Sequence, residues 1–305
     1  MLFLMNNKLE DIMKHTLILL VLFVALIANS CSNEKIENDW TRDNLQGKVL
    51  SYSEFSYEAK ERFGNIEKGE RILIRWYRGF GHLPLCNQGK YAENGNRTEE
   101  NWYKLDGSLD KKKTYEYDEK GNKIEGNEYN SDGSLDSKKT YEYAENGNRI
   151  EENMYNSDGS LDSKYTYKYA ENGNRTEENW YKLDGSLSHK RKYNYDEKGY
   201  KIELYIYRSD GRVELVETYK YDKKGNKIEC IGCGWDGTAT GYNETHKYDE
   251  KGNIIEYKGI LDNGFLHFKQ SYEYEFDKQG NWIKQIEFLD GIPTYILERQ
   301  YGYYD

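Results

Sequence analysis

Proline is almost missing from this sequence, with 2 residues in 305. Because proline removes a backbone donor and interrupts strand pairing, its scarcity leaves long uninterrupted sheets open to this chain. Aliphatic residues are also scarce: the mean hydropathy is −1.05, and 31 Tyr supply much of the apolar content. A large aliphatic core is therefore excluded, and we expect a thin, ordered structure whose sheet faces are covered by phenol rings.

Basic charge and catalytic motifs are missing as well. The net charge is −10, which disfavours a nucleic-acid partner because phosphate binding needs a basic surface. We find no nucleophile motif and no histidine pair at metal-binding spacing. Neighbouring carboxylates such as Glu99 and Glu100 point to opposite faces of a strand and cannot cooperate. We expect no enzyme, no cofactor and no metal site.

The N-terminal residues have the pattern of an export signal. Met13 and Lys14 precede an apolar run over 17–28, and small residues follow it. Twelve apolar residues are too few to span a bilayer of roughly 30 Å as a helix. We therefore predict a signal peptide over residues 1–30, with Met13 as the true start.

Cys31 directly follows Ser30, and this junction resembles a bacterial lipoprotein signal, in which the cysteine is lipidated and becomes the mature N-terminus. Ordinary cleavage after Ser30 is the alternative, because Ala28 and Ser30 also satisfy the small-x-small rule. Residues 31–89 do not follow the repeat described next. We interpret them as a tether and an irregular N-terminal cap that shields the first sheet edge.

Repeats dominate residues 90–305. One glycine series has spacings of 26 residues five times, then 27 and 28. Its members are Gly95, Gly121, Gly147, Gly173, Gly199, Gly225, Gly252 and Gly280. A second series, mostly preceded by Asp, lies between them, so each repeat holds two strands and two turns. The predicted fold is all-β: an antiparallel meander of about eight tandem β-hairpins forming an extended, twisted or coiled open sheet.

Tyrosines recur at fixed places in these repeats. Tyr115 and Tyr117 share one sheet face, and the same pair returns in each following unit as far as Tyr221. Tyr129 stands in a third series, on the return strand. It lies five residues after Ile124, so the two side chains face opposite sides unless a bulge intervenes, and the sequence leaves that open.

The motifs Tyr115–Asn122 and Tyr219–Asn226 resemble the YD repeats of the RHS family over about residues 90–305. The resemblance implies strips of β-hairpins that wind into a spiralling sheet, and in large members a shell around a toxin or a role at the cell surface. This chain lacks the self-cleavage core and toxin of those members, so we do not expect toxin encapsulation. A lesser similarity exists to MORN-type hairpin repeats.

Four side chains are candidates for binding or cross-linking. Trp102 and Trp180 occupy the same place three repeats apart, either as contacts along a polymer or as rings on a half-buried sheet face. Cys230 and Cys233 would form a disulfide in an oxidising envelope, with Cys86 free. The alternatives are a redox pair or half of a zinc site.

Two functions fit these observations. The first is a cell-envelope repeat lipoprotein, anchored to a membrane on the periplasmic face or the cell surface, that acts as a non-catalytic binding module for a glycan or surface polymer. The second is a protein-interaction scaffold of the envelope.

Overall fold

The computed structural model describes residues 38–72, 86–233, 242–261 and 264–305. The predicted signal peptide and Cys31 lie outside these described residues, which form one compact unit, Asn38–Asp305. A short helix, α2 (Asp39–Arg42), precedes the strands. The strands are β1 (Val49–Arg62), β2 (Asn65–Arg71), β3 (Cys86–Tyr91), β4 (Arg97–Tyr103), β5 (Leu109–Tyr117), β6 (Lys123–Asn130), β7 (Leu135–Tyr143), β8 (Arg149–Asn156), β9 (Leu161–Tyr169), β10 (Arg175–Tyr181), β11 (Leu187–Tyr195), β12 (Lys201–Arg208), β13 (Val213–Tyr221), β14 (Lys227–Cys233), β15 (Tyr242–Tyr248), β16 (Ile254–Ile260), β17 (Leu266–Phe276), β18 (Trp282–Leu289) and β19 (Ile292–Tyr303).

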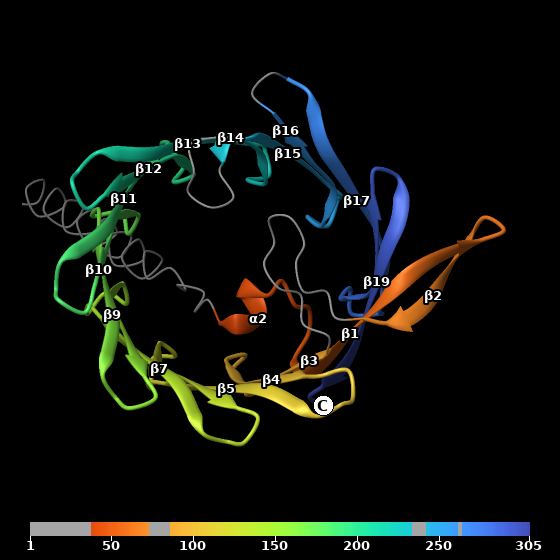
Figure 1. The fold of residues 1–305 in the computed structure, drawn as a ribbon, viewed down its shortest axis with the longest axis horizontal. Coiled ribbons are helices and arrows are strands. Elements are labelled where there is room, and N and C mark those ends of the chain that lie inside the picture. Colours follow the sequence, from red (N-terminus) through yellow and green to blue (C-terminus); the bar gives the residue numbers. More distant parts are fainter. Residues whose placement is uncertain (1–37, 73–85, 234–241, 262–263) are drawn as a thin grey trace, which may run out of the picture. The chain divides into compact units, whose positions relative to one another are not determined.

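The sheet closes on itself. From β3 to β19 each strand pairs antiparallel with the next, and β1 pairs with both β19 and β3. Tyr52 of β1, for example, lies opposite Tyr301 on one side and Gly89 on the other. The C-terminal part of β1, from Tyr57 to Arg62, pairs with β2. The two strands form a hairpin that is added to the ring (Figure 1). The described residues therefore form a closed antiparallel β-barrel of 18 strands.

The predicted open sheet is wrong. The segment interpreted as tether and cap contains β1, and β1 fills the gap between the first and last strands of the repeat region. A sheet edge leaves a row of backbone N–H and C=O groups without partners, and closure satisfies both edges at once. No edge at β3 or β19 is left for a cap to shield.

Tight turns of two kinds alternate along the repeats, and they define the two rims of the barrel. The turns after the odd-numbered strands from β3 onwards, such as 118–122, form the NG rim, and those after the even-numbered strands from β4 onwards, such as 130–134, form the DG rim. The β1–β2 hairpin projects on the DG side, because β1 runs antiparallel to β3. In the first kind Asp118 accepts hydrogen bonds from the amides of Lys120 and Asn122 at 2.9 and 2.8 Å. Gly121 has a φ of 83°, which a residue with a side chain rarely adopts.

A β-bulge follows each NG turn, and it determines which face of the sheet Tyr129 occupies. Glu116 pairs with Glu125 and Tyr117 with Lys123, so Ile124 is an extra residue without a partner on β5. After the bulge Glu125, Asn127 and Tyr129 alternate regularly onto one face. Bulges increase the local twist of a strand pair, which suits strands that curve into a barrel.

The helix α2 identifies the inner face of the wall. Figure 1 shows α2 inside the ring of strands, and the Tyr117 phenol donates a hydrogen bond of 2.6 Å to Asp39 in α2. Tyr117 and, by the two-residue period, Tyr115 therefore face the lumen. Tyr129 and its equivalents face outward. Buried apolar packing within the described ranges is confined to small clusters, such as that of Leu204, Tyr219 and Cys230.

Candidate functional site

The lumen wall is a repeated arrangement of a cation, a carboxylate and phenol rings. Each even-numbered strand from β4 to β14 begins with Arg or Lys, and these cations lie over tyrosine rings of neighbouring strands. Arg175 is 4.6 Å from the ring centre of Tyr167, and its guanidinium is 3.2 Å from Glu178. Cation–π contacts of this kind are worth about 0.5–2 kcal/mol each. The wall is therefore held by polar and aromatic contacts, as the composition predicts.

Neighbouring carboxylates are separated by the wall. Glu99 pairs with Lys90 and Lys112 at 2.9 and 2.7 Å, whereas Glu100 accepts from Arg97 in the lumen. Burial favours the neutral form of Glu99, but the outward hydrogen bonds from Lys112, Lys90 and Asn101 outweigh it and lower the pKa of Glu99 to about 2. Adjacent glutamates on these strands thus act on opposite sides.

Residues 38–46, which we call the latch segment, lie against the lumen wall near the NG rim. Asp39 accepts hydrogen bonds from the Arg97 amide at 2.7 Å and from Tyr117. Burial opposes ionisation of Asp39, but these hydrogen bonds outweigh it and hold its pKa below the usual value. At the other end of the segment, Asn281 accepts from the Gln46 amide at 2.7 Å and donates to the Gln46 carbonyl at 2.8 Å. The segment therefore connects β4 and β5 to the turn before β18.

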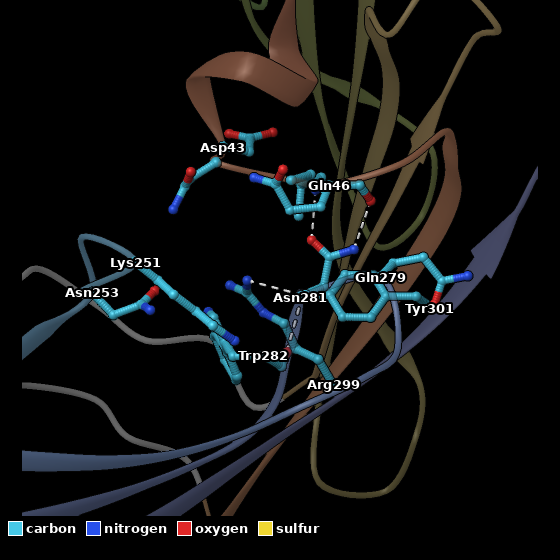
Figure 2. A pocket seen from close by; sticks show the side chains of 12 residues that line it. Asp43, Gln46, Lys251, Asn253, Gln279, Asn281, Trp282, Arg299 and Tyr301 are labelled. Carbon is cyan, nitrogen blue, oxygen red and sulfur yellow. Dashed lines mark hydrogen bonds between the residues drawn. The ribbon is translucent and has the colours of Figure 1, made fainter. Parts of the chain in front are cut away.

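A polar pocket of about 370 Å³ lies between the latch segment and the wall, and we call it the rim pocket (Figure 2). The latch contributes residues 43–46, and the turns before β16 and β18 contribute the opposite side. Trp282 and Tyr301 supply aromatic surface. Five carboxamides line the pocket: Asn44, Gln46, Asn253, Gln279 and Asn281.

The cations of the rim pocket are already engaged. Arg299 lies 3.8 Å from the ring centre of Trp282 and pairs with Glu54 at 2.7 Å. Lys251 lies 3.6 Å from the ring centre of Phe276. The pocket therefore offers mostly neutral hydrogen-bonding groups beside an aromatic ring.

The structure does not bring the predicted tryptophans together. Trp102 on β4 and Trp180 on β10 both face the lumen, six strands apart in the ring. Trp180 is stacked between Tyr165 and His189, with ring centres 5.8 and 5.4 Å away, and Lys113 lies 4.9 Å from the ring centre of Trp102. Neither tryptophan lines the rim pocket.

The structure tests the cysteine predictions only in part. Cys230 is fully buried and disulfide-bonded. The side chains of Cys86 and Cys233 lie outside the described part of the structure, so the pairing with Cys233 stays a prediction. In the described ranges, no cluster of three or more His, Cys, Asp or Glu side chains has an arrangement that would hold a metal ion.

Sequence reasoning missed the rim pocket. Its residues come from turns and from the latch segment, far apart in the chain and joined only by barrel closure. The one available signal was the change at the start of β18, where Trp282 stands in the place of the usual Arg, Lys or Ile. In the part of the chain that the structure describes, no helix has the length and hydrophobicity needed to cross a membrane.

Together these features define a closed, all-β barrel with a polar and aromatic lumen. No family model and no curated protein matches the chain. Among solved structures it is similar to a porin-like protein from Bacteroides uniformis, with 12% identity and a TM-score of 0.40 over 84% of this chain and 98% of that one. It is also similar to a porin-like protein from Bacteroides vulgatus, with 10% identity and a TM-score of 0.36 over 81% of this chain and 99% of that one.

A chain of the Photorhabdus luminescens Tc holotoxin pore is also similar, with 13% identity and a TM-score of 0.27 over 69% of this chain and 14% of that one. These scores are too low for any of the likenesses to indicate a function. No comparison identifies the YD repeat, and the closed ring differs from the spiralling strip that the RHS resemblance implies.

Proposed function

We propose that this protein is a non-catalytic binding module of the bacterial cell envelope, tethered through a lipidated Cys31, and that its rim pocket binds a neutral saccharide. The observation that carries the proposal is the lining of that pocket, five carboxamides beside Trp282 and Tyr301. A carboxamide both donates and accepts hydrogen bonds, which matches the hydroxyl groups of a sugar. Arg299 covers one face of Trp282, so the flat apolar surface for the C–H face of a pyranose comes from the other face of Trp282 and from Tyr301.

Three of these amides are available to a ligand. The side chains of Asn44, Gln46 and Gln279 make no hydrogen bond within the described part of the chain, whereas Asn281 is fully occupied by the latch segment and Tyr303. Polar groups in a pocket without protein partners are solvated when it is empty and can exchange water for ligand hydroxyls.

The outward face supports a barrel that stands in water beside a membrane. Glutamates and lysines alternate across neighbouring strands there, with Glu125 and Lys138 2.5 Å apart and Glu256 and Lys247 2.9 Å apart. A barrel embedded in lipid instead presents an apolar band outward. The tether therefore supplies the membrane attachment in this proposal.

A glycan array followed by titration calorimetry tests the proposal. We expect Gln279→Ala and Gln46→Ala to weaken binding of a neutral glycan about fivefold to tenfold each, because each removes one hydrogen bond to the ligand. Trp180→Ala, on the far wall, is the matched control and should leave the affinity unchanged. If the folded protein binds no neutral glycan, or if Trp180→Ala is the variant that weakens binding, the rim pocket is not the site.

The proposal also concerns the type of sequence repeat. We propose that the two strands and two turns of each unit are YD-type in sequence, although they close a barrel here. The proposal extends to the repeat unit alone and not to the shells or toxins of the RHS family.

The DG rim favours the second function, a protein-interaction scaffold. Phe63 is fully exposed at the tip of the β1–β2 hairpin and has a φ of 53°, a left-handed conformation that is strained for a bulky residue. Exposed large apolar side chains recur at the other tips of this rim: Leu105, Leu183, Val213, Phe265 and Ile292. An exposed apolar surface of this kind is typical of an interaction site.

Photo-crosslinking in intact cells tests the scaffold function. A photoreactive residue at Phe63 should yield one discrete crosslinked partner, while the same residue at Ser131, at a polar tip of the same rim, should not. Equal or absent crosslinking at the two positions would count against the scaffold.

A further inference from the structure

A three-part contact is repeated along the lumen wall. In the unit that begins at Arg149, Glu152 lies 3.1 Å from the guanidinium and accepts a hydrogen bond of 3.1 Å from Tyr167. The next unit repeats it: Glu178 lies 3.2 Å from Arg175 and accepts from Tyr193 at 2.8 Å. Each glutamate follows its cation by three residues and precedes its tyrosine by 15.

The first unit makes the same contact. Glu100 accepts from Arg97, three residues earlier, and from Tyr115, 15 residues later. Three units of the barrel thus place a carboxylate between one cation and one phenol at the same position of the lumen wall.

One unit lacks the carboxylate but keeps its partners. Lys123 is the cation and Tyr141 the phenol, and the position between them is Gly126. A side-chain atom at Gly126 would lie 3.4 Å from the Tyr115 ring and 3.8 Å from the Tyr141 hydroxyl, so a group placed there meets the same phenols. In two later units the position is filled by Leu204 and Cys230, which pack in an apolar cluster.

The missing side chain leaves a cavity of about 240 Å³. Lys113, Lys123 and Lys139 line it together with Tyr115, Tyr141 and one carboxylate, that of Glu128. This volume exceeds that of a carboxylate alone, so the space admits a carboxylate that belongs to a larger molecule.

The cavity carries excess positive charge. Lys113 pairs with Glu128 at 3.1 Å, and Lys139 pairs with Glu152 at 3.1 Å. Glu128 is shared with Lys111, which also pairs with Asp136, and Glu152 is shared with Arg149. Five cations thus face three carboxylates. Lys123 has no carboxylate within ion-pair distance in the described part of the chain, and it rests 3.9 Å from the ring centre of Tyr115.

Burial acts on both partners of the missing carboxylate. It lowers the pKa of Lys123 and, together with the charge of Glu152, raises the pKa of Tyr141 to about 12. An ammonium group that is desolvated without a counter-ion gains from an anion placed beside it.

We propose that the cavity at Gly126 is a binding site for the carboxylate of a small acidic ligand. The carboxylate takes the place that Glu100, Glu152 and Glu178 occupy in the other units, pairs with Lys123 and accepts a hydrogen bond from Tyr141. The remainder of the ligand occupies the cavity between Lys113 and Lys139. This site is separate from the rim pocket and does not require it.

Titration calorimetry on the full chain with sodium glucuronate, sodium acetate and glucose tests the proposal. We expect glucuronate to bind, acetate to bind more weakly and glucose not to bind. Gly126→Glu supplies the carboxylate from the protein and should weaken glucuronate binding at least tenfold. Gly126→Ala leaves the site without a carboxylate and should change the affinity less than threefold.

Thermal unfolding gives a second readout. Gly126→Glu should unfold at a higher temperature than Gly126→Ala, because the new carboxylate pairs with Lys123 and Tyr141. Glu178→Gly recreates the gap beside Arg175 and Tyr193, and it should add a second glucuronate site. Gln279→Ala in the rim pocket should leave glucuronate binding unchanged, which separates this site from the proposed saccharide site.

Equal binding of glucose and glucuronate would overturn the proposal, because the carboxylate would then have no role. Glucuronate binding that survives Gly126→Glu in a folded protein would overturn it as well.

Discussion

The Tyr117 hydroxyl lies 2.7 Å from the backbone carbonyl of Arg97, 20 residues earlier in the chain, and its single proton is shared as a hydrogen bond between this carbonyl and Asp39. The same bond returns in later units and ties the end of each odd-numbered strand to the start of the even-numbered strand before it. The tyrosines concerned are Tyr143, Tyr169, Tyr195, Tyr221, Tyr248 and Tyr274. A carbonyl next to a bulge has an irregular backbone environment, and these phenols satisfy it.

Tyr169→Phe should therefore lower the free energy of unfolding by about 1 kcal/mol, since it leaves the Arg149 carbonyl without its 2.8 Å donor. Chemical denaturation measures this. Tyr155→Phe is the matched control: Tyr155 is also half-buried but faces outward. Its hydroxyl has no protein partner in the described ranges, so the control should change stability by less than about 0.5 kcal/mol. Equal effects of the two variants on the free energy of unfolding would contradict a stabilising role for these tyrosine–carbonyl hydrogen bonds.

Glu287 should make the barrel less stable as pH rises. Burial raises the pKa of Glu287 from 4.5 to about 7, although a hydrogen bond from Gln270 opposes the shift. The folded protein then holds this proton more tightly than the unfolded chain, so the contribution of Glu287 to the free energy of unfolding falls between about pH 4.5 and 7. Glu287→Gln removes this dependence and should stabilise the protein at pH 8 by up to about 3 kcal/mol, with little change at pH 4.5.

Chemical denaturation of the wild type and of Glu287→Gln between about pH 4.5 and pH 8 checks the prediction. Glu275→Gln is the control, because Glu275 faces outward and pairs with Lys284 at 2.7 Å; it should give no stabilisation at pH 8. A constant difference between Glu287→Gln and the wild type at all pH values would contradict the assignment.

Asp39 should hold the latch segment in the lumen. Asp39→Ala removes the acceptor of the Arg97 amide and should cost about 1–3 kcal/mol, because that donor becomes unpaired in a buried place. Hydrogen exchange should then accelerate at residues 39–46 while β7 to β9 stay protected. Arg42→Ala, which removes an exposed partner of Asp39, should leave exchange at these residues unchanged. Loss of protection throughout the barrel would instead show that Asp39 stabilises the whole barrel and does not act on the latch segment alone.

Local chemistry explains how much of the fold could be predicted from the sequence. Asp-x-x-Gly-Asn turns and Asp-Gly turns mark where strands end, and Leu109–Tyr117 and Lys123–Asn130 lie between them. Closure was not predictable in the same way. It depends on β1, whose sequence lies outside the repeat, and on the accumulated curvature of many bulged strand pairs. Neither leaves a local motif.

The candidate sites show the same limit. The sequence displays the tryptophans, but not which strands meet across a lumen, so it points to Trp102 and Trp180 as binding candidates and not to Trp282. The site at Gly126 depends on an alignment of the repeats in space. That Glu100, Glu152 and Glu178 share one place, and that Gly126 leaves it empty, follows only once the bulges fix which neighbouring residue faces inward.

The distance between β3 and β19 tests the account most directly, because closure places every lumen contact. Gln88 and Gln300 both pair with Ser53, so spin labels attached there through a ketone-bearing amino acid should report a backbone separation of about 10 Å, two strand spacings. A narrow distribution below about 25 Å, allowing for the label arms, is the expected result. A separation approaching roughly 75 Å, the width of a flat sheet from β3 to β19 at the same spacing, would show an open sheet and contradict the barrel.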